Sequence, residues 1–247
     1  MALGACGKAP AARDADAAAQ AQEVGYLTPP TPDAVRLDAS GVVLAGRGPS
    51  GGKVRLAQPN GQAVFAPVDA GGRWTIGLGR ADQPRIFGLS ATQGGHTAQA
   101  EGYVLVTPRG EAALLRAGGA AVRIDSAAGP GFRAIDFDVG GGVQAACAAP
   151  PRAAVILRLD GRQVAQGRAD ETGRYVASLP PAGQPAIRPG PHQLEMVGDG
   201  FADSATFTVG PVAPLAEGPM RSQLTPAGLR LDWMTPGGGV QSTLITH

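Results

Sequence analysis

Aromatic residues are scarce in this chain, with six Phe, three Tyr and two Trp among 247 residues. The cores must therefore be built from Val, Leu, Ile and Ala. No apolar run reaches the eighteen or so residues of a membrane-spanning helix. Lys and Arg (21) nearly balance Asp and Glu (20), which gives a formal net charge of +1. That balance, without a basic stripe interleaved with aromatics, argues against a nucleic-acid surface.

Signatures of catalysis and metal binding are also lacking. The sequence contains no H-E-x-x-H, C-x-x-C or P-loop pattern, and its three histidines, His96, His192 and His247, are not paired at metal-ligand spacing. Asp136 and Asp138 alternate on one expected strand and would share a face. They could bind a cation together with loop oxygens, but a solvated strand face is the preferred interpretation. We expect no enzyme, cofactor or metal.

Two short motifs resemble functional signatures and are interpreted as loops. Gly46 to Gly51 fits G-x-G-x-x-G, but a strand follows it where the dinucleotide fingerprint needs a helix. Ser50 to Lys53 fits S-x-x-K, but its two glycines oppose the helix on which that motif depends.

Glycine and proline are abundant instead, with 38 and 22 residues. Together with alternating apolar runs, they predict many short strands joined by turns. The stretch from Val155 to Leu179 shows the pattern most clearly. It alternates with a period of two up to Asp160-Gly161, a pair typical of β-hairpins. Asp170 to Gly173 then fits a type I turn before the next strand.

The same plan occurs about one hundred residues earlier, from Val54 to Leu78. That spacing is the size of one small β-sandwich, so we interpret the chain as two copies of one domain. The matched positions are Asp69 and Asp170, Gly72 and Gly173, Arg73 and Arg174, and Trp74 and Tyr175.

A strand, an Asp-Gly or Asn-Gly turn, then Asp-x-x-Gly-Arg-Trp/Tyr and a later Gly-x-His-x-Leu resembles the bacterial Ig-like (Big-type) modules of surface and envelope proteins. The second copy has the later element as Gly190 to Leu194, whereas the first departs from it at Arg85 to Leu89. The resemblance covers roughly residues 33 to 214. It implies a β-sandwich fold, and such modules serve as spacers, stalks and binding platforms.

We therefore expect an all-β chain of two tandem Ig-like β-sandwiches with a disordered N-terminal tether and a C-terminal β-hairpin tail. The second sandwich is expected to open with strands at 112–117 and 121–124. The expected segments are a lipobox remnant and Ala/Pro-rich tether (1–32), the first sandwich (33–108), the second sandwich (109–214) and the tail with its Gly-rich loop (215–247).

The two cysteines have different contexts. Cys6 follows Leu3-Gly4-Ala5, which resembles the bacterial lipobox and implies lipidation of Cys6. The charged and apolar parts of a signal peptide do not precede it, so this prediction requires a start codon upstream of Met1. Cys147 is expected to be a small buried hydrophobe. A Cys6–Cys147 disulfide is the alternative, which lipidation of Cys6 would exclude.

The tail should form a hairpin. Leu229 to Trp233 and Val240 to Ile245 flank the loop residues Gly237, Gly238 and Gly239. A lone hairpin is unstable in water, so it must dock on the second sandwich, extend one of its sheets or pair with another chain. Trp233, beside the loop, is the best candidate for an exposed aromatic residue. Trp233 and the three glycines are therefore the candidate interaction site.

Trp74 and Tyr175 could stack on sugars, but their equivalence favours a shared packing role beside the turn.

The resulting hypothesis is a non-enzymatic cell-envelope lipoprotein, lipid-anchored on the periplasmic face or the cell surface, that acts as a spacer or interaction module. Its partners would be the membrane, through the anchor, and a protein or cell-wall glycan, but no nucleic acid. The alternative is a carbohydrate- or peptidoglycan-binding accessory module, which needs an exposed aromatic platform.

Overall fold

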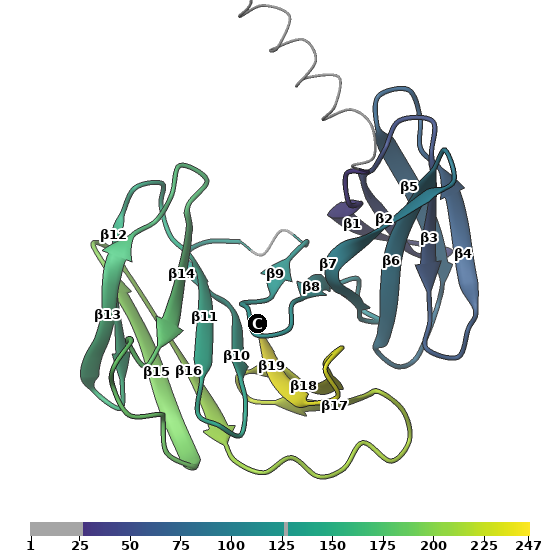
Figure 1. The fold of residues 1–247 in the computed structure, drawn as a ribbon. Coiled ribbons are helices and arrows are strands. Elements are labelled where there is room, and N and C mark those ends of the chain that lie inside the picture. Colours follow the sequence, from purple (N-terminus) through teal and green to yellow (C-terminus); the bar gives the residue numbers. More distant parts are fainter. Residues whose placement is uncertain (1–26, 126–127) are drawn as a thin grey trace, which may run out of the picture.

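A computed structural model describes residues 27–125 and 128–247. Cys6 and most of the expected tether lie outside these ranges. The regular structure of the described residues is entirely β, with nineteen strands in four sheets (Figure 1), which confirms the all-β prediction. Among the described residues, no helix is long and apolar enough to cross a membrane.

The first sandwich is formed by two sheets, named A and B. Sheet A has the order β1-β2-β5 and sheet B the order β4-β3-β6-β7-β8-β9. The sheet A strands are β1 (Thr31–Asp38), β2 (Gly41–Arg47) and β5 (Arg73–Gly79). The sheet B strands are β4 (Ala63–Pro67), β3 (Lys53–Ala57), β6 (Arg85–Gln93), β7 (His96–Val106), β8 (Ala112–Leu115) and β9 (Val122–Arg123).

The second sandwich is formed by sheets C and D. Sheet C has the order β14-β11-β10-β19-β18-β17 and sheet D the order β13-β12-β15-β16. The sheet C strands are β14 (Arg174–Leu179), β11 (Val143–Ala148), β10 (Gly131–Phe137), β19 (Val240–Thr246), β18 (Gly228–Met234) and β17 (Met220–Thr225). The sheet D strands are β13 (Arg162–Arg168), β12 (Ala154–Leu159), β15 (Gly190–Gly198) and β16 (Phe201–Val209).

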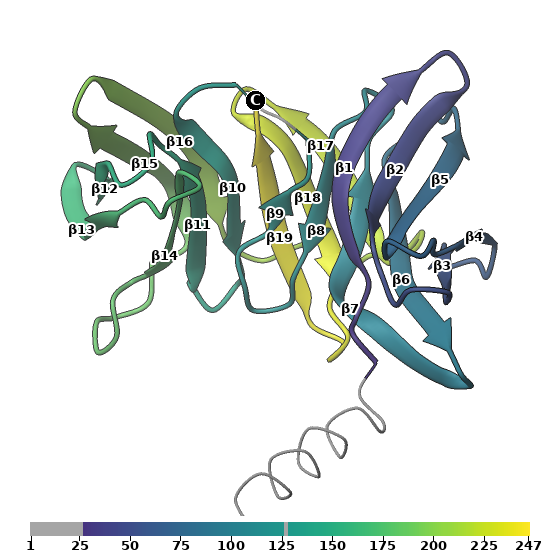
Figure 2. The same cartoon turned by 90° about the horizontal axis from the view of Figure 1, so that it is seen from above.

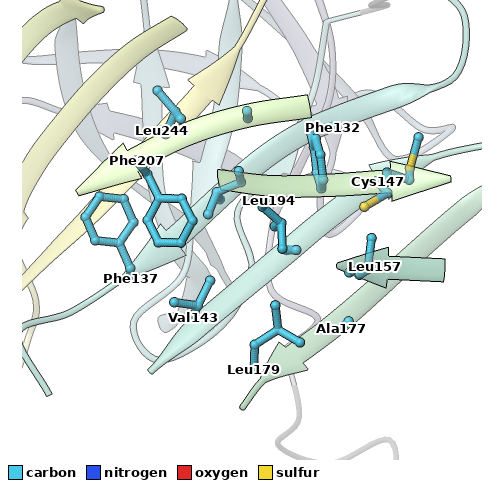
Figure 3. Packing of buried hydrophobic residues seen from close by; sticks show 14 of the residues in the cluster. Phe132, Phe137, Val143, Cys147, Leu157, Ala177, Leu179, Leu194, Phe207 and Leu244 are labelled. Atoms are coloured by element: carbon cyan, nitrogen blue, oxygen red, sulfur yellow. The ribbon is translucent and has the colours of Figure 1, made fainter. Parts of the chain in front are cut away.

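Period-two patterning explains how each strand faces its core. On β16, Ala205, Phe207 and Val209 are buried while the intervening threonines are exposed. Phe207 packs against Phe137 of β10 with ring centroids 5.1 Å apart. Figure 3 shows these rings together with side chains from β11, β12, β14 and β15 between sheets C and D.

The repeated turns form as expected and show why the motif recurs. The side chain of Asp170 accepts hydrogen bonds from the backbone N–H groups of Thr172 (2.8 Å) and Arg174 (2.9 Å). Asp69 does the same for Arg73 at 2.8 Å. Each carboxylate thus holds the turn that leads into β14 or β5. The hairpin before β13 uses positive φ at Asp160 (50°) and at the following glycine (77°), as a two-residue turn requires.

Sheets B and C also pack on each other, and this third core makes the protein a four-layer stack in the order A, B, C, D. On β7, Val104 and Val106 face sheet A while Leu105 faces sheet C; on β10, Ile135 faces sheet D while Ala134 faces sheet B. Figures 1 and 2 both show β8 and β9 of sheet B beside β17–β19 of sheet C, where the two sandwiches meet. The buried members of the third core are Ile86, Leu105, Ala113, Leu115, Ala120, Ala121, Ala134, Ala146, Leu229, Leu231, Trp233 and Ile245.

Two features differ from the expectations. The strands predicted at 112–117 and 121–124 do not begin the second sandwich, because β8 pairs with β7 and β9 pairs with β8, which extends sheet B. A short turn, closed by the Thr107 N–H to Glu111 C=O bond at 2.9 Å, returns the chain directly beside β7. The tail hairpin extends sheet C, as one expected alternative had it, but it also carries β17, which the sequence did not predict.

We predict that Trp233→Ala lowers the free energy of unfolding by about 3–5 kcal/mol, because it leaves a large cavity in the third core. Met234→Ala is the matched control. The Met234 side chain is 44% exposed on the same strand, so its loss should cost less than about 1 kcal/mol. Urea denaturation of both variants checks the prediction, and equal losses would contradict it.

Candidate functional site

Trp233 is not exposed, and the expectation that it is was wrong. Its side chain is 0% exposed. The indole N–H donates to the hydroxyl of Thr243 at 3.0 Å, and Tyr103 of β7 meets the indole edge-on with ring centroids 6.0 Å apart. The reason is that β18 is an inner strand of sheet C, and the face of β18 that carries Trp233 packs against sheet B.

Trp74 and Tyr175 have the packing role that their equivalence predicted. Trp74 is 2% exposed, and its indole N–H donates to the carbonyl of Arg47 at 2.8 Å. Tyr175 is half-buried, and its ring lies so close to Gly167 of β13 that a Cβ there would approach the ring to 2.6 Å. The three aromatics therefore do not form a shared exposed platform for a sugar.

The residues around the hairpin tip line an open groove instead. It is a cavity of about 400 Å³ between the tip and sheet B. Met234 is the exposed apolar side chain at its rim. The lining residues are Ala57, Gln58, Pro59, Ile86, Phe87, Gly88, Tyr103, Pro219, Met234, Thr235 and Pro236.

The loop beside this groove is a tight turn with an exposed backbone. Thr235 N–H donates to Gly239 C=O at 2.8 Å, and Gly238 N–H donates to Thr235 C=O at 2.9 Å. Gly238 has φ of 81°, a conformation that favours glycine. Gly237, Gly238 and Gly239 are all exposed. No charged side chain is among the described residues that line the groove, so its chemistry suits an apolar peptide side chain more than a reacting group.

A second cluster, made of hydrogen-bonded polar residues that the sequence did not predict, lies between sheets B and C and includes residues of β19. Asp136 is only 2% exposed, so the expected solvated strand face is wrong. Its carboxylate accepts hydrogen bonds from Ala121 N–H (2.7 Å), Thr243 Oγ1 (2.5 Å) and Gln241 Nε2 (3.1 Å). Ala121 belongs to the loop after β8, which covers this face of β10, whereas Thr243 and Gln241 lie on β19, the strand paired with β10.

Gln241 extends this Asp136 cluster into the loop between β8 and β9. Its side-chain amide donates to the carbonyl of Arg116 at 3.1 Å and accepts from Gly118 N–H at 2.9 Å. The cluster therefore links three segments that are distant in sequence. Burial raises the pKa of Asp136 to about 6, although the three hydrogen bonds and the nearby Arg116 oppose that rise.

Asp232, on the opposite face of sheet C, is also buried, but its pKa is lowered and not raised. Burial disfavours its charge, but hydrogen bonds from Arg221 (2.7 Å), Ser242 (2.7 Å) and Arg230 (3.0 Å) outweigh that effect and lower its pKa. Asp136 differs because all three of its hydrogen-bond donors are neutral groups.

The remaining predicted residues do not join these sites. Asp138 is exposed and accepts from Gly142 N–H in its own turn at 3.4 Å. The described residues hold no group of three or more potential metal ligands. Cys147 is buried on β11, as expected, and burial raises the pKa of its thiol to about 12. Cys6, and with it the predicted lipidation and the alternative disulfide, lies outside the described residues.

No protein-family model and no curated protein matches this chain. Among solved structures, a biofilm-associated protein BSP domain aligns with a TM-score of 0.25 and 12% identity over 76% of this chain and 30% of that one. The central fibronectin-III array of RIM-binding protein aligns with 0.25 and 13% over 87% and 89%. A 1.5-MDa bacterial ice-binding adhesin gives 0.23 and 12% over 87% and 88%. This chain thus spans less than a third of the biofilm-associated chain, and likenesses at this level support no functional conclusion.

We predict that the contribution of Asp136 to protein stability falls as pH rises from about 4 to about 6. An Asp carboxyl titrates near 3.8 when unfolded, whereas the pKa of Asp136 in the fold is about 6. Between these values Asp136 binds more protons in the folded chain than in the unfolded chain, so raising the pH favours unfolding, by about 2 kcal/mol over this range.

Asp136→Asn should remove this fall, because an amide does not titrate in the range. Asp138→Asn, on the exposed neighbour, is the control and should retain it. Urea denaturation at several pH values between 4 and 7 measures the effect. Identical pH profiles for the two variants would rule out Asp136 as its source.

Proposed function

We propose that this protein is a non-enzymatic module of the bacterial cell envelope, anchored through a lipid on Cys6 and contacting a protein partner at the hairpin tip. The observation that carries the proposal is the groove beside Gly237, Gly238 and Gly239. It is open, apolar and free of charged lining residues among those described. Such a surface recognises a partner by shape and apolar burial, not by charge.

The four-layer stack supports a spacer role for the rest of the chain. Two Ig-like sandwiches joined only by a linker would move independently, whereas the third core and the Asp136 cluster fasten sheet B to sheet C. The groove is formed by residues from both sheets, so this fastening also fixes its shape. A rigid body on a tether would present the groove at a distance from its anchor.

A protein partner is preferred over a glycan because of where the aromatic side chains lie. Sugar binding commonly uses exposed aromatic faces, but Trp74 and Trp233 are both buried. The anchor rests on different support: Leu3-Gly4-Ala5 precedes Cys6, and the Pro-rich segment from Thr28 to Pro32 includes the start of β1 at Thr31.

The anchor is tested with the gene expressed from its native locus, with its upstream DNA. If Cys6 is lipidated, the wild type should sediment with membranes. Mass spectrometry of its mature N-terminus should then show an acylated Cys6. Cys6→Ser should shift the protein to the soluble fraction. An intact Met1 followed by unmodified Cys6 in the wild type would refute the anchor.

The groove is tested by photo-crosslinking from position 237 in intact cells. We expect a defined protein adduct that Met234→Asp abolishes, because a charge at the rim opposes apolar docking. Leu37→Asp is the control, since Leu37 is also an exposed apolar side chain (55%) but lies on β1. An adduct that survives Met234→Asp, or the absence of any adduct, contradicts the proposed surface.

A further inference from the structure

Strand β17 is the last strand of sheet C, and its outer edge is unpaired (Figure 1). It spans Met220–Thr225, pairs with β18 in a regular register, and contains neither a proline nor a bulge. Its one charged side chain, Arg221, is already bound to Asp232 of β18 at 2.7 Å. Prolines, bulges and free charges are the usual protection of an edge strand against pairing with another strand. β17 therefore has an edge that is open to a further strand.

The register with β18 shows which backbone groups of β17 are free. Met234 N–H donates to Pro219 C=O at 2.8 Å, so this pair is a hydrogen-bonded one. Bonded and non-bonded pairs alternate along an antiparallel ladder. The N–H and C=O groups of Met220, Ser222 and Leu224 therefore point away from β18. Within residues 27–125 and 128–247, no other segment forms a hydrogen bond with them.

Two cavities lie along this edge, one at each end of β17. The groove at the hairpin tip includes Pro219, which immediately precedes the strand. A second cavity of about 400 Å³ is lined by Ser222 and Leu224 of β17 and by Leu229, the residue opposite Leu224 on β18. The side chain of Leu224 is 61% exposed. The free backbone groups thus lie between two hollows.

The start of β6 in sheet B forms the other side of both cavities. Pro84, just before β6, lines the second cavity, whereas Ile86, Phe87 and Gly88 line the groove at the hairpin tip. Met220, between the two hollows, packs against the third core, to which Ile86 belongs. The two cavities are therefore the ends of one trough between the free edge of β17 and sheet B. We call it the edge trough.

Sheet B continues beyond the edge trough with β3 and β4, so an added strand would rest on protein. Ala57 of β3 lines the trough and pairs with Gly88, where a Cβ would meet nothing closer than 4.0 Å. Phe65 of β4 faces away from sheet A and is 51% exposed. Two strands provide a ledge about 10 Å wide.

The same ledge disfavours a second copy of this chain as the occupant. Two copies paired through β17 about a two-fold axis would both carry sheet B on the same side of the joined sheet. Their ledges of β3 and β4 would then compete for the same space. The edge trough therefore suits a single extended segment.

We propose that the protein partner binds as an extended strand that pairs with β17 and becomes the seventh strand of sheet C. This inference rests on the proposed function, because the groove at the hairpin tip is one end of the edge trough. Backbone hydrogen bonds to Met220, Ser222 and Leu224 would supply affinity, and side chains that face sheet B would enter the two hollows. Such side chains recur about every 7 Å along a strand, and Pro219 to Leu224 covers about 17 Å, so one short segment reaches both.

The two ends of the edge trough differ in charge, which defines the chemistry of the partner strand. The groove at the hairpin tip has no charged lining residue among those described, so an apolar side chain fits there. The second cavity is lined by the carboxylates of Asp82 and Glu111 and by one guanidinium, that of Arg109. With the imidazole of His247 neutral, the formal balance of this lining is negative, so a Lys or Arg side chain suits it.

The test selects random displayed peptides of about ten residues on the purified chain, at about pH 8. Selected peptides should alternate apolar residues and carry a basic residue toward one end. Their synthetic forms should slow amide hydrogen exchange at Met220, Ser222 and Leu224 about tenfold or more, but not at Gln223, which is bonded to β18 already. A selection without enriched peptides, or a bound peptide that leaves the three amides unprotected, would overturn the proposal.

Variants of β17 separate strand pairing from other contacts. Ser222→Pro removes a free N–H and obstructs an incoming strand without touching the bonds to β18. It should weaken peptide binding about tenfold or more, whereas Ser222→Ala retains the N–H and should bind like the wild type. Leu224→Lys leaves the backbone intact and repels a basic side chain, so it should also weaken binding even where the proline variant folds poorly. Undiminished binding by Ser222→Pro and Leu224→Lys would contradict the proposal.

Photo-crosslinking from position 237 in cells distinguishes this inference from the proposed function. Strand pairing predicts an adduct that is lost in Ser222→Pro and Leu224→Lys but kept in Ser222→Ala. An adduct that only Met234→Asp abolishes would leave the partner at the groove and refute strand pairing alone. The absence of any adduct would refute both. Sedimentation of the purified chain as a dimer that Ser222→Pro dissociates would assign the edge to a second copy and also overturn the inference.

Discussion

The pairing of β19 with β10 is the interaction on which the rest of the structure depends. Four residue pairs, from Ala134–Ile245 to Phe137–Ser242, place the last strand of the chain at the centre of sheet C. From there Leu244 enters the core shared with sheet D, while Ile245 enters the core shared with sheet B. The same strand brings Thr243 to Asp136. One C-terminal strand therefore helps to close the second sandwich, to join it to the first and to position the hairpin tip.

The join between sheets B and C combines an apolar core with a buried carboxylate, and the two contribute differently. Burial of side chains such as Trp233 and Leu231 supplies the favourable free energy. Asp136 costs free energy to ionise there, which is why its pKa is raised. Two of its donors, Gln241 and Thr243, lie on β19 of the same sheet, whereas Ala121 N–H comes from the loop after β8 of sheet B. The carboxylate therefore receives all three hydrogen bonds only when that loop lies against sheet C. It favours one arrangement of the sheets over others.

Local signals predicted most of the fold, and non-local packing accounts for what they missed. The Asp160-Gly161 hairpin and the Asp170 turn are encoded within a few residues, and both form as predicted. Asp136 appeared to be a solvent-facing residue because it alternates with apolar neighbours, and its partners lie 105 and 107 residues away. The burial of Trp233 and the pairing of β8 with β7 likewise depend on sheet contacts that no local pattern specifies. The glycine loop could be predicted from sequence, but the groove beside it could not.

The central claim is that the third core makes the two sandwiches one rigid body. It is tested most directly by a distance measurement between spin labels at positions 55 and 158, exposed sites on β3 and β12, in a background without Cys6 and Cys147. One narrow distance distribution in the intact chain, which broadens with Trp233→Ala, is the predicted result. A broad distribution in the intact chain would show two sandwiches moving independently and would contradict the account.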